Sequence, residues 1–138
     1  MNTLILALAP FVGSDLCPTT PSSAGTGARL FENPPEGQGV TTLVVNDGVP
    51  GRWGIRISSS RPLAPSPWPG AVGTLCIDPR DSFFERDIPR KPNTSGIVVM
   101  PRPWRPWPQY VQWWYRDRDE QGKPISNFSN SIRLEVST

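Results

Sequence analysis

Proline is spread along the whole chain and limits its fold more than any other residue type. The 138 residues include 18 prolines and 12 glycines. A proline inside a helix removes a hydrogen bond and clashes with the preceding turn, whereas turns, extended connections and edge strands tolerate it. No segment has a convincing amphipathic repeat of helical period. We therefore expect an all-β chain, and its length is typical of a single domain.

Two segments near the C-terminal end alternate with a period of two residues. They are residues 109–119 (QYVQWWYRDRD) and 127–136 (NFSNSIRLEV), joined by a polar connection that contains glycine and proline. This pattern predicts an antiparallel strand pair. In the first segment the alternation places Val111, Trp113 and Tyr115 on one side and the intervening residues on the other.

Shorter β-rich runs occupy the middle of the chain, at residues 40–45, 52–58, 71–77 and 96–100. Asn46, Asp47 and Gly48 tolerate positive φ and predict a hairpin between the first two runs. With the C-terminal pair, these runs predict a single small antiparallel β-sandwich of about 7–9 short strands. Extended Pro-rich arms are expected at residues 14–27, 59–70 and 100–108.

The N-terminal part differs in composition from the rest. We divide the chain into residues 1–27, an N-terminal strand followed by a Ser/Thr/Pro-rich arm, and residues 28–138, the β-sandwich. The apolar run at 4–12 is read either as a first strand or as a leader. A cleaved signal peptide is doubtful because no Lys or Arg precedes the run and Pro10 interrupts it. The run is too short to span a bilayer.

Charge and histidine content exclude several classes of function. The formal net charge of +2 is too small to select nucleic acid or an anionic membrane as a partner. The chain has no histidine, which removes the usual general base and the commonest metal ligand. No spacing of the remaining acids and nucleophiles indicates a catalytic set. We expect a protein that is not an enzyme and uses no cofactor.

Cys17 and Cys76 are the only cysteines. A disulfide between them closes a long loop and contributes about 4 kcal/mol to stability in the chain-entropy model. The alternative is two buried thiols, and the sequence does not choose between them. A structural metal site is not expected, because two thiolates without histidine do not complete the usual ligand set.

Residues 117–122 (DRDEQG) resemble the start of a calcium loop, with Asp117 and Asp119 as weak candidate ligands. The match is incomplete, because position five is Gln121 and position twelve is Phe128. We favour a solvated turn between strands.

Six tryptophans give the chain its strongest candidate contact residues. Two of them alternate with arginine and proline in residues 100–108, and such rigid, amphipathic side chains are suited to docking on another surface. The alternative is that these segments fold back over the domain, with arginine stacked on tryptophan. Trp113 and Trp114 are expected in the core. The predicted partner-binding residues are Trp68, Arg102, Trp104, Arg105 and Trp107.

Several of these motifs recur together in a known group of domains. The chain resembles uncharacterised β-rich domains of secreted proteins from planctomycetes and related bacteria. The residues that carry the resemblance are a Cys-bearing strand at 74–76, the aromatic strand QWWYRD at 112–117, and NFSN at 127–130, which leads into a last strand at 132–136. The resemblance covers about a third to a half of the chain. It implies a β-sandwich-like extracellular module and carries no catalytic residues.

We therefore expect a non-enzymatic structural or interaction module that docks into a larger extracellular, cell-surface or virion-type assembly through its Pro/Trp-rich arms. Its partners are then other protein subunits, a second copy of the chain included. The alternative is a carbohydrate-binding cell-surface module in which exposed tryptophans stack on sugar rings.

Overall fold

The computed structural model describes residues 15–33 and 42–136, and these residues form strands and loops without any helix. The all-β prediction is confirmed. Within the described ranges no helix has the length and apolarity needed to cross a membrane. The strands are β1 (Asp15–Cys17), β2 (Arg29–Asn33), β3 (Thr42–Asn46), β4 (Gly54–Ser59), β5 (Pro62–Pro67), β6 (Thr74–Ile77), β7 (Glu85–Arg86), β8 (Val98–Pro101), β9 (Gln109–Arg118) and β10 (Pro124–Leu134).

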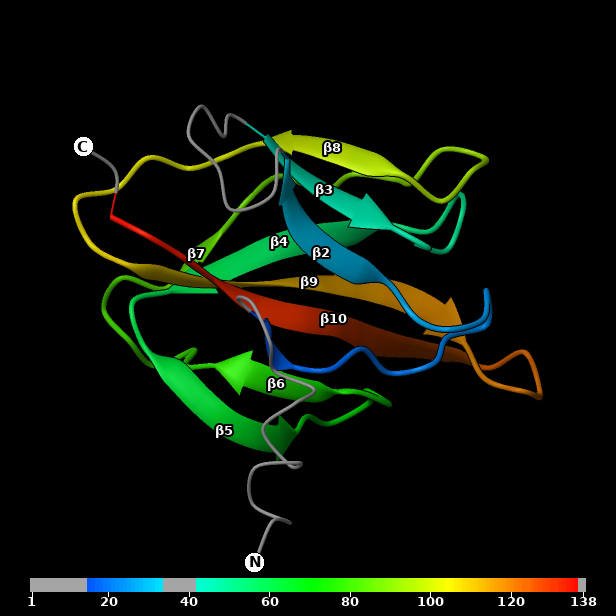
Figure 1. Cartoon of the computed structure of the whole chain (residues 1–138). Helices are drawn as coiled ribbons and strands as arrows, with labels where there is room; N and C mark the ends of the chain where they lie inside the picture. The colour runs from blue at the N-terminus through cyan, green and yellow to red at the C-terminus, as the bar shows by residue number, and fades with distance from the viewer. Residues whose placement is uncertain (1–14, 34–41, 137–138) are drawn as a thin grey trace, which may run out of the picture.

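The strands form three antiparallel sheets arranged as layers (Figure 1). The central sheet has the order β1-β10-β9-β4-β7, the second sheet β2-β3-β8, and the third β5-β6. The second sheet lies above the central sheet in Figure 1 and the third lies below it. We call the two surfaces of the central sheet the β3 face and the β6 face, after the strands that pack on them.

Alternation along β9 assigns its side chains to these two faces, as the sequence predicts. Val111, Trp113 and Tyr115 are buried in the larger core on the β3 face. Tyr110 and Trp114 are half-buried and pack against the smaller core on the β6 face. The larger core also contains Leu30, Leu43, Val45, Val98, Met100, Ile132 and Leu134, and the smaller core contains Ile57, Leu75, Ile77 and Phe128.

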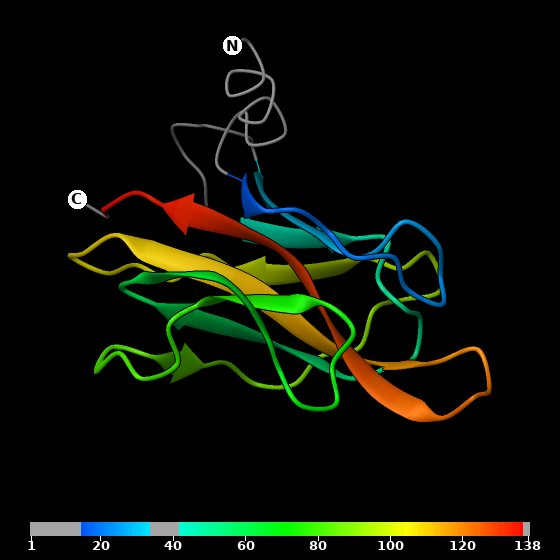
Figure 2. The same ribbon diagram turned by 90° about the horizontal axis from the view of Figure 1, so that it is seen from below.

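The predicted C-terminal strand pair is present as β9 and β10, and the tip of this hairpin extends beyond the other strands (Figure 2). A β-bulge interrupts the pairing, because Phe128 lies opposite Trp114 whereas Ser131 lies opposite Gln112. The extra residue reverses the alternation of β10. Phe128 therefore enters the core on the β6 face, while Ile132 enters the core on the β3 face.

Three fully buried amide side chains hold other layers and segments to the central sheet. Gln112 binds the backbone of β6: its Oε1 accepts from Cys76 N–H at 3.0 Å, and its Nε2 donates to the Thr74 carbonyl at 2.8 Å. Asn130 binds β2 in the same way. Asn127 Nδ2 donates to the Pro21 carbonyl at 3.0 Å. A buried amide contributes several hydrogen bonds where apolar packing alone leaves backbone groups unpaired.

The N-terminal arm is attached to the domain over its described part. Residues 15–17 pair with β10 as β1, and a disulfide joins Cys17 to Cys76 of β6. Of the two alternatives for the cysteines, a disulfide or two buried thiols, the structure shows the disulfide. It links the edge of the central sheet to the third sheet.

Two expectations about connections are wrong. The predicted hairpin between residues 40–45 and 52–58 does not form, because β3 pairs with β2 and β8 while β4 pairs with β9 and β7. The turn tolerates positive φ as expected, with Asp47 at +54°, but it connects two layers. Residues 59–70 also contain a strand, β5, which pairs with β6 in spite of its prolines. As an edge strand, β5 tolerates the missing N–H groups.

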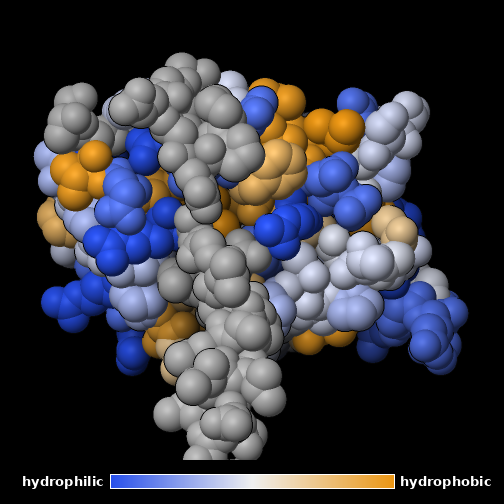
Figure 3. All heavy atoms as spheres, viewed as in Figure 1, coloured by the Kyte–Doolittle hydropathy of each residue, from blue (hydrophilic) through white to orange (hydrophobic). Residues whose placement is uncertain are grey.

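Two further predictions concern the two ends of the chain. The apolar run at residues 4–12, which was read as a first strand or a leader, lies outside the described residues. The alternation in residues 127–136 predicts that Val136 points inward, but its side chain is 42% exposed. On the face of the molecule shown in Figure 3, hydrophobic residues form separate patches between hydrophilic ones.

Candidate functional site

The predicted contact segment at residues 100–108 is fixed to the domain. Arg102 is buried; its Nε lies 3.4 Å from Glu32 Oε2 and its Nη2 donates to the Glu135 carbonyl at 3.0 Å. These interactions attach the segment to β2 and to the residues after β10. The Arg102 guanidinium also lies 4.9 Å from the ring centroid of Trp104, whose side chain is 55% exposed.

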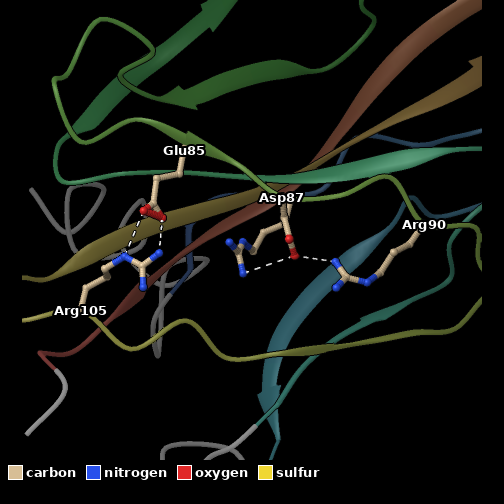
Figure 4. A network of polar contacts seen from close by, with 5 residues as sticks. Glu85, Asp87, Arg90 and Arg105 are labelled. Carbon is tan, nitrogen blue, oxygen red and sulfur yellow. Dashed lines mark hydrogen bonds and ion pairs between the residues drawn. The ribbon is translucent and has the colours of Figure 1, made fainter.

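The second half of this segment is held at β7. Arg105 forms a two-point ion pair with Glu85, at 3.0 Å from Nε and 2.9 Å from Nη2 (Figure 4). Trp107 packs against Phe83, with the ring centroids 4.3 Å apart. Of the two alternatives for these residues, the structure supports the one in which the segment folds back over the domain.

A second ion cluster in Figure 4 surrounds Asp87, which lies between two arginines. Its Oδ2 is 2.5 Å from Arg90 Nη1 and 3.6 Å from Arg56 Nη1. Burial is the largest single influence on the pKa of Asp87, and it raises this pKa. The hydrogen bonds from Arg90 and from the Ile88 N–H, together with the charge of Arg56, outweigh burial, so the pKa of Asp87 lies below its ordinary value. Burial lowers the pKa of Arg56. This cluster fixes residues 85–90 against β4.

The weak calcium candidates both bind backbone N–H groups. Asp117 accepts hydrogen bonds from the backbone N–H and the hydroxyl of Ser23, and thereby fastens the N-terminal arm to the end of β9. Asp119 Oδ1 accepts from Gln121 N–H and Lys123 N–H, at 2.9 and 2.8 Å, which closes the β9–β10 turn. In the described part of the chain, no group of three His, Cys, Asp or Glu side chains is arranged to hold a metal ion.

Trp68 lies on the β6 face, at the edge of a narrow apolar gap of about 30 Å³ shared with Phe84, Trp114 and Phe128. Its side chain is partly exposed. Trp114 stacks on Phe128, with the ring centroids 6.0 Å apart. The gap is too small to hold more than one or two water molecules, so it is not a ligand site. Trp68 borders the smaller core, but its side chain is exposed.

Next to this margin, the β6 face of the central sheet carries an open groove of about 390 Å³. Its walls are mainly apolar, and one indole, Trp53, is 52% exposed. Trp114 is half-buried beside it. The groove lies beyond the part of the sheet on which β6 packs. It is lined by Trp53, Gly54, Ile55, Pro89, Trp114, Tyr115 and Arg116.

Backbone hydrogen bonds fix the walls of this groove. Arg116 N–H donates to the Trp53 carbonyl at 2.8 Å, which extends the β4–β9 pairing to Trp53. Gly54 and Arg90 exchange two hydrogen bonds of 2.9 Å, which hold the Pro89 segment at the edge of β4. Gly54 is required here because a Cβ atom at this position would overlap the Trp113 indole. The backbone of the groove walls is therefore fixed by main-chain hydrogen bonds, while the side chains of Trp53 and Arg116 that border the groove are exposed.

The charges at the groove are positive. Lys91 Nζ lies 4.6 Å from the ring centroid of Trp53, which is a cation–π distance. Arg116 is exposed, and the groove-lining residues include no carboxylate. An apolar floor with cations at its border is suited to binding an amphipathic, anionic ligand.

The predicted partner-binding residues do not include any residue that lines this groove. Trp113 is buried as predicted, but Trp114, also expected in the core, forms a wall of the groove. The alternation in residues 52–58 predicts that Trp53, Ile55 and Ile57 share one face of a strand, and the positions of Ile55 and Ile57 agree. Trp53 was predicted only as a strand residue, and Pro89 and Arg116 were given no role in binding. The groove could have been predicted only from the pairing of Trp53-Gly54-Ile55 with Trp114-Tyr115-Arg116. The sequence does not show this pairing, because it does not show that β4 lies beside β9.

Comparisons with protein-family models, with curated proteins and with solved structures give no match to this chain. The resemblance to β-rich domains of secreted bacterial proteins stays a prediction. What the groove binds must be inferred from its own residues.

Proposed function

We propose that this chain is a non-enzymatic interaction module and that it binds a protein partner through the aromatic groove on the β6 face. The observation that carries the proposal is the juxtaposition of an exposed indole, Trp53, with half-buried Trp114 and exposed Arg116 in one preformed groove. Tryptophan and arginine are the residues most enriched at energetic hot spots of protein interfaces.

The rigidity of the groove supports a binding role. The backbone of its walls is held by the Trp53–Arg116 and Gly54–Arg90 hydrogen bonds, so little backbone conformational entropy is lost when a ligand binds. The Cys17–Cys76 disulfide supports a partner in an oxidising compartment, as in an extracellular, cell-surface or virion-type assembly.

The contact surface proposed here differs from the arm expected from the sequence. Three of the predicted contact residues, Arg102, Arg105 and Trp107, are used within the chain. Trp104 is the exposed tryptophan of that segment, and it serves as a matched comparison for Trp53.

A carbohydrate is the second candidate ligand, because the exposed Trp53 indole offers a ring face on which a sugar can stack. A sugar also needs several hydrogen-bond partners for its hydroxyl groups, and burying hydroxyls without them is unfavourable. The groove supplies one charged side chain, Arg116, beside apolar walls. The lining therefore favours the protein partner.

The test is selection of peptides from a random display library on the immobilised chain, alongside a glycan array. We expect enriched peptides that bind the wild-type chain and Trp104→Ala equally and bind Trp53→Ala at least about tenfold more weakly. Loss of binding in Trp104→Ala alone would place the contact in the 100–108 segment and contradict the proposal. Glycan binding that depends on Trp53, without enriched peptides, would replace it with the second candidate.

A further inference from the structure

We infer that the occupant of the aromatic groove is an extended, proline-containing peptide segment that carries a carboxylate side chain. This inference depends on the proposed function and adds the chemistry of the partner to it. It follows from the walls of the groove, the state of its backbone groups and the charges at its border.

The walls of the groove favour a ligand with rings and apolar surface. Trp53, Ile55, Pro89 and Trp114 supply most of the lining. Proline-rich segments in the polyproline II conformation dock into such aromatic-lined grooves, because their rings pack on indole faces and their conformation is largely fixed before binding. The volume of about 390 Å³ is within the range of small-ligand sites and is suited to a few residues of an extended chain.

The backbone around the groove argues against an added β-strand as the occupant. The Trp53 carbonyl already accepts a hydrogen bond from Arg116 N–H, and the N–H and carbonyl of Gly54 are both bonded to Arg90. A new strand would find these groups in use. A polyproline II segment needs no ladder of backbone hydrogen bonds, so it fits the groove without competing for them.

The charges at the border select an acidic partner. Arg116 is exposed, with no ion pair to another described residue, and Lys91 lies over Trp53. Of the acidic groups described above, Asp87 is engaged by Arg56 and Arg90, and Asp117, next to Arg116 in the chain, is engaged by Ser23. A carboxylate on the bound segment therefore meets a cation that is free to pair with it, whereas a lysine would be repelled.

The test uses three synthetic nonapeptides, each of three repeats, and the full chain, with binding measured by calorimetry at low and at physiological ionic strength. The repeats are Pro-Pro-Glu, Pro-Pro-Gln and Pro-Pro-Lys. We expect the Glu peptide to bind at least about fivefold more tightly than the Lys peptide, and this difference to shrink with added salt. Trp53→Ala should abolish binding of all three peptides, and Trp104→Ala should leave it unchanged.

Arg116→Gln tests the charge contribution, with Arg133→Gln on β10 as the matched control. In Arg116→Gln the advantage of the Glu peptide over the Gln peptide should disappear, and in Arg133→Gln it should stay. Equal affinities of the three peptides for the wild-type chain would overturn the acidic preference. If none of the three binds while displayed peptides still require Trp53, this inference fails and the proposed function stands; if displayed peptides also show no dependence on Trp53, the proposed function fails as well.

Discussion

The side-chain amide of Asn130 binds the backbone of Leu30 as a neighbouring strand would. Leu30 N–H donates to Oδ1 at 2.7 Å, and Nδ2 donates to the Leu30 carbonyl at 2.9 Å. Both residues are buried. One side chain on the bulge of β10 thus satisfies both backbone groups of an edge residue in β2 and joins two of the three sheets.

Asn130→Ala should lower the free energy of unfolding by roughly 2–4 kcal/mol, because it leaves a buried N–H and a buried carbonyl without partners. Denaturant unfolding monitored by tryptophan fluorescence measures this loss. Asn46, at the exposed end of β3, provides the control, and Asn46→Ala should change stability by less than about 0.5 kcal/mol. Equal losses in the two variants would contradict the role assigned to Asn130.

Gln112→Leu should release the third sheet locally. The Gln112 amide bonds to Cys76 N–H, the Thr74 carbonyl and the Ser129 carbonyl, so its loss leaves buried groups of β6 unpaired. Hydrogen exchange should become faster in β6, while exchange in β3 stays close to that of the wild-type chain. Gln121→Leu, in the exposed turn, should alter neither strand. Uniform acceleration throughout the chain would indicate global destabilisation and contradict this assignment.

Gly54→Ala should destabilise the chain by about 1–3 kcal/mol, because the added Cβ overlaps the buried Trp113 indole. Near-ultraviolet circular dichroism should report the displaced indole. Gly51→Ala, where the Cβ meets open space, should cost only about 1 kcal/mol, from its positive φ. A Gly54→Ala variant as stable as wild type, with an unchanged Trp113 signal, would show that the packing is looser than described.

Replacing both Cys17 and Cys76 by Ala should lower the free energy of unfolding by about 4 kcal/mol in the chain-entropy model, because the disulfide joins residues 59 positions apart. Unfolding of the wild-type chain in a thiol reductant should approach that of the variant. Identical unfolding midpoints with and without reductant would contradict a stabilising bond.

Acid should destabilise the chain partly through Asp87. Its pKa in the folded chain lies below the ordinary value of 3.8, so its contribution to stability is present above that pH and is lost as the pH falls through the folded pKa. Asp87→Asn should be less stable than wild type at neutral pH, and its stability should fall less steeply with acid. An unchanged acid slope in Asp87→Asn would contradict the ion cluster with Arg56 and Arg90.

The sequence predicted the parts of this fold that depend on local pattern. Two-residue alternation placed Trp113 and Tyr115 correctly, and the composition indicated an all-β chain. The sequence did not predict that β4 lies beside β9, because the turn at Asp47 is compatible with a hairpin and also with a crossing between layers. The strand at β5 was missed because its prolines disfavour a central strand but not an edge strand.

The NFSN motif at residues 127–130, on which the predicted resemblance partly rests, has structural roles in this chain. Asn127 binds the N-terminal arm, Phe128 enters the core, the Ser129 hydroxyl accepts from Trp113 N–H at 2.8 Å, and Asn130 binds β2. A local sequence pattern does not predict such long-range hydrogen bonds. For the same reason the groove was not predicted: Trp53 and Arg116 lie 63 positions apart and meet only through the β4–β9 pairing.

The central claim is that ligands contact Trp53 and Trp114 in the groove. The most direct test is the indole N–H region of a two-dimensional NMR spectrum, in which the six tryptophans are assigned by single Trp→Phe variants. On titration with a peptide enriched by display, we predict that the Trp53 and Trp114 signals shift while those of Trp104, Trp107 and Trp113 stay in place. Shifts confined to Trp104 and Trp107 would contradict the groove as the binding site.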